Sequence, residues 1–180
     1  MKRISSGVRS KAKDISLLLL DVDGVLTDGR IIIDDRGIET KCFNVRDGQG
    51  ISWLLRSGID VGIITSRTSQ SVSHRAKELG ISLVRQGVAD KLAAYNMIQQ
   101  RRHLKDSQVA YMGDDIVDLA ILRRAGFALT VADAWPKLFP FVDYVTGAKG
   151  GAGAVREVAE LLLKAQGKWA SAIAGFDSKN

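Results

Sequence analysis

The chain has 180 residues, 46% of them hydrophobic, and only 2 prolines, which predicts one globular domain and excludes a disordered or fibrous protein. Its single cysteine, Cys42, excludes an internal disulfide and fits a reducing compartment. The formal net charge is +6, but five basic residues precede Asp14, and the rest of the chain keeps +1. The charge therefore predicts a basic tail, and we expect no nucleic-acid partner.

This basic tail is the first predicted segment, residues 1–13, and we expect it to be flexible; its basic residues are Lys2, Arg3, Arg9, Lys11 and Lys13. A single domain is predicted over residues 14–168, followed by a loosely structured tail over 169–180. The apolar run after the basic tail stops at Asp21 with no small-residue cleavage site, so we expect no signal peptide. Because no other apolar run approaches a bilayer-spanning length, we expect a cytoplasmic protein without a membrane partner.

From Leu17 onward, short apolar runs alternate with longer amphipathic stretches. The predicted strands are Leu17–Leu20, Val61–Thr65, Leu83–Val84, Val109–Met112, Phe127–Val131 and Tyr144–Val145. The predicted helices are Gly48–Ser57, Ser69–Leu79, Lys91–Arg102, Ile116–Arg124, Trp135–Phe139 and Ala154–Ala165. Repeated alternation of strand and helix predicts an α/β fold, a three-layer, doubly wound, Rossmann-like core with a mainly parallel sheet.

One segment interrupts this alternation directly after the first strand. The stretch "RIIIDDRGIETKCF", about residues 30–43, places two β-rich runs on either side of a turn at residues 35–37. This pattern predicts a β-hairpin insertion. The spacing of the remaining elements leaves no room for a separate domain that could cover the carboxyl ends of the strands, so we expect a capless fold.

Polar residues follow the predicted strands at the points where the strands end: Asp21 and Asp23, then Thr65, then Lys91, then Asp114 and Asp115. Residues at the carboxyl ends of parallel strands meet at one edge of the sheet. An acid pair there resists desolvation and repels itself, so it needs a positive charge beside it. The residue types predict a Mg²⁺ site.

This set of carboxylates, a hydroxyl and an amine suits phosphoryl transfer. One aspartate can attack phosphorus to form an aspartyl phosphate, while a second protonates the leaving oxygen and later activates water. Each motif alone has a structural alternative: a turn for "DVDG", a capping hydroxyl for Thr65, a solvated lysine for Lys91 and a helix start for "GDD". The phosphoryl-transfer hypothesis is favoured because all four motifs occur at successive strand ends.

On these residues the chain resembles the haloacid dehalogenase (HAD) superfamily of phosphohydrolases. In "DVDGV" the resemblance implies that Asp21 is the nucleophile and a metal ligand, and that Asp23 is the general acid/base, with its backbone carbonyl on the metal. It implies that Thr65 holds the transferring phosphoryl group and that Lys91 neutralises nucleophile and phosphate. In "GDDIVD" it implies Asp114 as a direct Mg²⁺ ligand, with Asp115 and Asp118 supporting the ligands.

The motifs "FNVRDGQGI", "IITSR", "QGVADK" and "GAVREVAELLLKAQGK" make the chain similar to the 3-deoxy-D-manno-octulosonate 8-phosphate (Kdo 8-phosphate) phosphatase family over about residues 14–168. The resemblance implies hydrolysis of this sugar-acid phosphate to Kdo and inorganic phosphate, in lipopolysaccharide biosynthesis. It also implies a homotetramer in which the hairpin and the C-terminal segment of one subunit cover a neighbour's active site. The implied substrate contacts are Asn44, Val45, Arg46, Asp47, Gly48, Arg67 and Arg75.

Three alternatives stay open at this point. The same core occurs in relatives that act on sialic-acid-type or KDN 9-phosphates, and the chain departs from the family pattern at Ser52, Ser66 and Ala152. A receiver-like phospho-accepting module also combines acids, a hydroxyl and a lysine, but it carries its phosphorylated aspartate after the third strand, where this chain has "RQGVADK". A non-catalytic assembly protein of the same fold is disfavoured because Asp23 is present.

Overall fold

The computed structural model describes residues 5–177, without the side chains of residues 175–177. Its central sheet has six strands in the order β5-β4-β1-β6-β7-β8, and every neighbouring pair is parallel. The strands are β1 (Leu17–Leu20), β4 (Asp60–Ile64), β5 (Leu83–Arg85), β6 (Val109–Met112), β7 (Phe127–Thr130) and β8 (Tyr144–Val145). The predicted doubly wound α/β core is confirmed.

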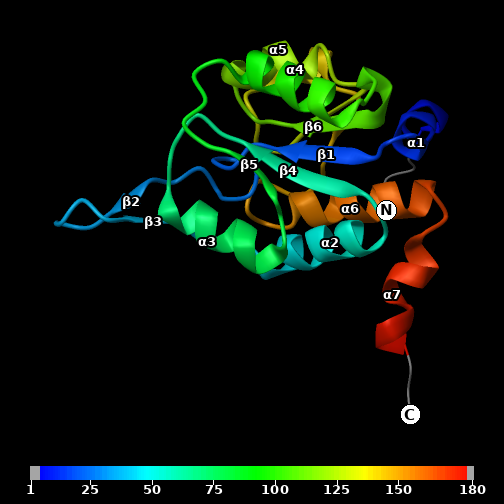
Figure 1. Ribbon diagram of the computed structural model, residues 1–180, viewed down its shortest axis with the longest axis horizontal. Helices are drawn as coiled ribbons and strands as arrows, with labels where there is room; N and C mark the ends of the chain where they lie inside the picture. Colours follow the sequence, from blue (N-terminus) through cyan, green and yellow to red (C-terminus); the bar gives the residue numbers. More distant parts are fainter. Residues whose placement is uncertain (1–4, 178–180) are drawn as a thin grey trace.

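Helices cover both faces of this sheet, with α2, α3 and α6 on one face and α4 and α5 on the other (Figure 1). The helices are α1 (Ser6–Lys13), α2 (Val45–Arg56), α3 (Gln70–Leu79), α4 (Lys91–Arg102), α5 (Leu119–Leu122), α6 (Ala154–Ala165) and α7 (Trp169–Asp177). In β1, Leu18 and Leu20 face the first layer, whereas Leu17 and Leu19 face the second. Four consecutive leucines therefore suit a central strand that is buried on both sides.

The predicted hairpin is also present, and it projects from the body of the protein (Figure 1). Its two strands, β2 (Ile32–Ile33) and β3 (Glu39–Thr40), pair antiparallel. The Asp34 carboxylate closes the turn by accepting hydrogen bonds from the backbone amides of Arg36 and Ile38, at 3.0 and 2.8 Å. Apart from loops, β2 and β3 are the only elements between the end of β1 and α2, as the capless prediction requires.

Several predicted helix boundaries differ from those observed. Helix α2 begins at Val45 and not at Gly48, because the Asn44 side chain caps it by accepting the Arg46 amide at 2.8 Å. The predicted helix over residues 116–124 is a 3₁₀ turn, η2 (Ile116–Asp118), followed by the short α5. Two further 3₁₀ segments are η1 (Asp106–Gln108) and η3 (Pro136–Phe141).

The two predicted tails contain helices in their described parts. Helix α1 occupies residues 6–13, where we expected a flexible segment, and it packs its buried Ala12 against the layer that contains α6. Helix α7 occupies residues 169–177, and Trp169 meets Trp53 edge-on with ring centroids 5.3 Å apart. Both helices are held by tertiary contacts that local sequence does not reveal. No helix in the described range 5–177 is long and apolar enough to cross a bilayer.

Asp47 joins helices α2 and α6. Only 1% of Asp47 is exposed, and its carboxylate accepts hydrogen bonds from the backbone amides of Arg156 and Gly153, at 2.7 and 3.2 Å. These amides belong to the N-cap residue and the first turn of α6, where amides have no partner within the helix. Burial raises the pKa of Asp47, and the amide hydrogen bonds partly offset this effect. In this structure Asp47, which we expected at the substrate, caps a helix.

We expect Asp47→Ala to lower the free energy of unfolding by about 1–3 kcal/mol, because it leaves buried amides of α6 unpaired. Urea denaturation followed by circular dichroism measures this loss. Asp60→Ala is the matched control, since Asp60 forms an exposed ion pair with Arg102 that is worth about 1 kcal/mol or less. Equal stability of the two variants would contradict the capping role.

Candidate active site

The predicted site residues gather where β1, β4 and β6 end. Strand β1 lies at the centre of the sheet, and the chain leaves it toward β4 on one side and reaches β6 on the other, which is the switch point where α/β sheets bind ligands. A cavity of about 290 Å³ opens there. Its lining includes Asp21, Asp23, Thr65, Arg67, Lys91, Asp114 and Asp115. Polar residues that follow different strands in the sequence therefore line one cavity, as predicted.

Lys91 lines this cavity and pairs with two carboxylates. Its ammonium group lies 2.8 Å from Asp21 Oδ2 and 2.7 Å from Asp118 Oδ1, and only 4% of its side chain is exposed. Burial acts to lower the pKa of Lys91, but the charges of Asp21 and Asp118 outweigh burial and raise it. Lys91 is therefore a fixed positive charge beside the carboxylate that we expect to attack phosphorus.

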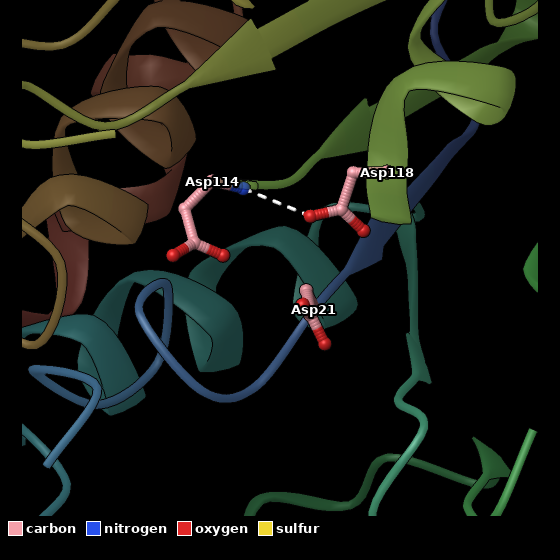
Figure 2. Close-up of side chains that lie close together, drawn as sticks. All are labelled: Asp21, Asp114 and Asp118. Atoms are coloured by element: carbon pink, nitrogen blue, oxygen red, sulfur yellow. Dashed lines mark hydrogen bonds between the residues drawn. The ribbon is translucent and has the colours of Figure 1, made fainter. Parts of the chain in front are cut away.

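Asp118 is fully buried and contacts several residues of the site. Its Oδ1 accepts hydrogen bonds from Lys91 Nζ at 2.7 Å and from Tyr111 Oη at 2.5 Å. Its Oδ2 accepts the backbone amide of Asp114 at 3.0 Å (Figure 2) and that of Asp115 at 3.3 Å. Four donors leave this fully buried carboxylate little capacity to bind an ion. Its geometry suits orienting Lys91 and the backbone of Asp114.

Three carboxylates come together at this edge of the sheet (Figure 2). Asp21, Asp114 and Asp118 each bring an oxygen within 4.8 Å of the other two. Burial raises the pKa of Asp21 to about 6, with a further rise from Asp118, although Lys91 opposes it. Burial raises the pKa of Asp114 to about 7, and the charges of Asp118 and Asp21 add to it.

These shifts test whether the residues fit a divalent cation. Crowded, partly desolvated carboxylates are costly as anions, and a bound cation removes that cost. Mg²⁺ takes oxygen ligands at about 2.0–2.1 Å, so two ligand oxygens on opposite sides are about 4.2 Å apart. The carboxylate oxygens of Asp21 and Asp114 already lie within 4.8 Å of each other. Since Asp118 is already saturated by donors, Asp21 and Asp114 are the carboxylates that suit the ion.

Gly24 allows Asp114 to approach the loop that follows β1. The backbone of Gly24 has φ +86°, and a Cβ atom at this position would lie 2.0 Å from Asp114 Oδ2. A side chain is thus excluded both by the left-handed conformation and by the carboxylate. The glycine of "DVDG" therefore has a steric role in the site in addition to its role in the turn.

Asp23 lies at the mouth of the cavity, in contact with the hairpin. It forms an ion pair with Lys41, and its Oδ2 is 3.7 Å from Arg67 Nε. Glu39 pairs with Lys41 at 3.3 Å and with Arg67 at 2.6 Å. The hydrogen bond to Glu39 raises the pKa of Arg67, so the guanidinium stays charged.

Most of the other predicted substrate contacts lie outside this cavity. Asn44, Asp47, Gly48 and Arg75 line a separate apolar cavity of about 10 Å³. Arg75 crosses Gly48 so closely that a Cβ there would lie 2.2 Å from Arg75 Nη2, and it pairs with Glu78 at 2.8 Å. Val45 is 78% exposed, and Arg46 is also exposed on the first turn of α2. Among the predicted substrate contacts, only Arg67 lines the larger cavity.

Three polar residues around the site were not predicted from the sequence: Lys41, Glu39 and Tyr111. Glu39 and Lys41 are two apart in an extended segment, which places them on the same side, and this spacing could have indicated a shared partner. Tyr111 gave no signal, because it resembles any aromatic residue of a buried strand. Val117, which is 56% exposed, also lines the cavity and was not predicted.

Comparison with known proteins decides the family. Residues 81–158 match the family model described as haloacid dehalogenase-like hydrolase. The chain is 48% identical over 165 residues to 3-deoxy-D-manno-octulosonate 8-phosphate phosphatase KdsC of Escherichia coli (strain B / BL21-DE3), covering 92% of this chain and 88% of that protein. The chain belongs to the Kdo 8-phosphate phosphatase family of HAD hydrolases.

Solved structures of this family share the fold. The Kdo 8-phosphate phosphatase of Yersinia pestis is 48% identical with a TM-score of 0.90, covering 91% of this chain and 89% of that one. The enzyme of Moraxella catarrhalis, solved in complex with a magnesium ion, a phosphate ion and a KDO molecule, is 47% identical with a TM-score of 0.92. That match covers 94% of this chain and 98% of the other. The resemblance recognised in the motifs is confirmed.

The raised pKa values of Asp21 and Asp114 predict how stability depends on pH and Mg²⁺. Between about pH 4 and about pH 7 the metal-free folded protein keeps protons that the unfolded chain has released, so its free energy of unfolding falls as pH rises. We therefore expect Mg²⁺ to raise Tm more at pH 8 than at pH 5.5. At 100 times its dissociation constant, Mg²⁺ should stabilise the fold by about 3 kcal/mol.

Asp114→Asn should reduce both the pH dependence and the Mg²⁺ effect, whereas Asp60→Asn, at the opposite end of the strands, should change neither. Differential scanning calorimetry of metal-free and Mg²⁺-loaded protein measures the two effects. A Mg²⁺-induced rise in Tm that is undiminished in Asp114→Asn would show that Asp114 does not bind the ion.

Proposed function

We propose that this protein is a Mg²⁺-dependent phosphatase that hydrolyses Kdo 8-phosphate to Kdo and inorganic phosphate through an aspartyl phosphate on Asp21. The observation that carries the proposal is the placement of Asp21 between buried Lys91 and Asp114 in a cavity that also holds Asp23 and Thr65. The names of the related proteins support the choice of sugar acid. The reaction belongs to lipopolysaccharide biosynthesis, in the cytoplasm.

The ion site consists of the carboxylates of Asp21 and Asp114 and the backbone carbonyl of Asp23. Bound there, Mg²⁺ supplies positive charge that offsets the negative oxygens of the phosphoryl group. Lys91 supplies a second positive charge, and its pairing with Asp21 keeps that carboxylate ionised and oriented. The Thr65 hydroxyl, at the end of β4, holds a phosphoryl oxygen.

Phosphoryl transfer to Asp21 is the first step. An Asp21 carboxylate oxygen attacks phosphorus, the bond between phosphorus and the C8 oxygen breaks, and Asp23 gives its proton to that oxygen. The products of this step are free Kdo and the aspartyl phosphate. Asp21 Oδ1 accepts the Val22 amide at 2.7 Å, and this contact limits rotation of the nucleophile.

Hydrolysis of the aspartyl phosphate is the second step. Asp23, now a carboxylate, takes a proton from a water molecule while the water oxygen attacks phosphorus. The bond between phosphorus and the Asp21 oxygen breaks, which restores the Asp21 carboxylate and releases inorganic phosphate. One carboxyl group thus serves as acid and then as base, as the position of Asp23 at the mouth of the cavity allows.

The proposal includes a homotetramer in which the hairpin and the C-terminal segment of one subunit cover the site of a neighbour. The hairpin carries four isoleucines that are 42–57% exposed, at positions 31, 32, 33 and 38. An apolar projection of this kind is typical of an assembly surface. The other predicted substrate contacts would then depend on assembly to bring them to a site; they are Asn44, Val45, Arg46, Asp47, Gly48 and Arg75. Asp47 suits this role least, because it is buried and caps α6.

The substrate assignment predicts a preference among sugar-acid phosphates. We expect kcat/KM for Kdo 8-phosphate to exceed that for N-acetylneuraminate 9-phosphate and KDN 9-phosphate by at least about tenfold, because a site shaped for one sugar acid discriminates by a few kcal/mol. Phosphate release measured side by side on the three substrates tests this. A preference for a nine-carbon substrate would replace the Kdo assignment and keep the phosphatase.

Asp21→Asn should abolish release from every one of these substrates, since it keeps the shape of the nucleophile but removes its charge. Asp60→Asn is the matched control and should retain full activity. Near-normal turnover by Asp21→Asn would contradict the aspartyl-phosphate mechanism. An aspartyl phosphate that persists for hours in the purified wild type would instead support a receiver-like phospho-accepting module.

The hairpin predicts a dependence of assembly on its apolar surface. Ile33→Glu places a charge on the exposed hairpin and should shift the tetramer to smaller species, with loss of Kdo 8-phosphate hydrolysis. Met97→Glu is the control, because Met97 is 46% exposed on α4, away from the hairpin. Sedimentation velocity measures both. A wild type that is monomeric at micromolar concentration with full activity would contradict the assembly.

A further inference from the structure

Lys41, at the foot of the hairpin, has no role in the mechanism described above, yet it touches the general acid/base. Only 2% of its side chain is exposed, and its ammonium group pairs with Asp23 Oδ1 and lies 3.3 Å from Glu39 Oε1. Lysine is rarely buried to this extent unless it is paired. A buried ammonium group beside a reacting carboxylate calls for an explanation.

The surroundings of Lys41 form a closed set of four charged side chains. Glu39 is 16% exposed and pairs with Lys41 and, at 2.6 Å, with Arg67 Nη2. Arg67 Nε in turn lies 3.7 Å from Asp23 Oδ2. Two acids and two bases leave the four side chains without net charge. The three partners of Asp23 are two cations and one anion, so beside their electrostatic effect they restrain where the Asp23 carboxyl group lies.

The two oxygens of Asp23 face different cations. Lys41 donates a hydrogen bond to Oδ1, whereas Arg67 Nε lies 3.7 Å from Oδ2, beyond hydrogen-bond distance, so Lys41 is the partner that restrains the carboxyl group most directly. The side chain is 23% exposed at the cavity mouth, where an unpartnered carboxylate would exchange between rotamers. A displacement of about 1 Å can cost a proton-transfer step about 100-fold in rate.

We propose that Lys41 is a positioning residue, which holds Asp23 where it can protonate the leaving oxygen. This inference rests on the proposed phosphatase function and adds a residue to it. Because Lys41 directly follows β3, the proposal also makes the hairpin a part of the catalytic geometry. Movement of the hairpin would move the proton donor.

The test uses the need of the leaving group for a proton. An alkyl oxygen such as C8–O of Kdo must be protonated as it departs, whereas p-nitrophenolate departs without a proton. The ratio kcat/KM includes phosphoryl transfer and departure but not the later hydrolysis of the aspartyl phosphate. We expect Lys41→Met to lower kcat/KM for Kdo 8-phosphate at least about tenfold more than for p-nitrophenyl phosphate.

Arg36→Met is the matched control, because it removes a basic partner of Asp34 on the same hairpin at 78% exposure, away from Asp23. This variant should leave the ratio of kcat/KM for Kdo 8-phosphate to kcat/KM for p-nitrophenyl phosphate unchanged. In an Asp23→Asn background, Lys41→Met should cause no further loss with either substrate. The proposal would be overturned if Lys41→Met lowered kcat/KM equally for both substrates, or lowered it for neither. A further fall in kcat/KM in the Asp23→Asn background would also overturn it.

A second pair of variants covers the case in which Lys41→Met does not fold because Glu39 is left without its ammonium partner. Glu39→Gln and Glu39→Gln/Lys41→Met differ only in the ammonium group, and the same tenfold change in substrate ratio is expected between them. If the wild type prefers another sugar-acid phosphate, that alkyl phosphate takes the place of Kdo 8-phosphate. The Kdo assignment can then fail while the role of Lys41 stands, and the reverse also holds.

Discussion

The site depends on the ion pair between buried Lys91 and two carboxylates, Asp21 and Asp118. Asp21, the proposed nucleophile, lies at the end of a strand that is buried on both faces, where an isolated anion is costly. One ammonium group stabilises it, and Asp118 fixes that group with the help of Tyr111 and two backbone amides. At Asp114, burial together with the charges of Asp118 and Asp21 raises the pKa to about 7, so a cation beside this carboxylate is favoured. Divalent-ion binding follows from this electrostatic arrangement.

The core and the strand ends could be predicted because their signals are local. Four leucines in β1 indicate a strand covered on both faces, and the polar residues after each strand indicate one shared edge. Helix α1 could not be predicted in the same way, since a short basic helix with one buried residue, Ala12, is stabilised by packing against distant α6. The early start of α2 does have a local signal, because Asn44 is a favoured capping residue.

The same distinction applies to the site. Asp21, Asp23, Thr65, Lys91 and Asp114 are placed by the order of the strands, and they lie around one cavity. The roles of Lys41, Glu39 and Asp47 depend on contacts between segments far apart in the chain, such as Asp47 with the first turn of α6. A charged residue on a hairpin is usually solvated, so the sequence around Lys41 does not predict that its side chain is buried. The hairpin therefore has two surfaces: exposed isoleucines that suit assembly, and a buried foot that contacts Asp23.

The most direct test of the account is a crystal structure of the protein with Mg²⁺ and beryllium fluoride, which mimics a phosphoryl group on a carboxylate. The account predicts the beryllium bonded to an Asp21 oxygen, Lys91 beside the fluorides, and Mg²⁺ bound by Asp21 and Asp114 with Asp118 still held by its four donors. A fluoroberyllate on another residue, or Mg²⁺ bound by Asp118 with Asp114 turned away, would contradict it.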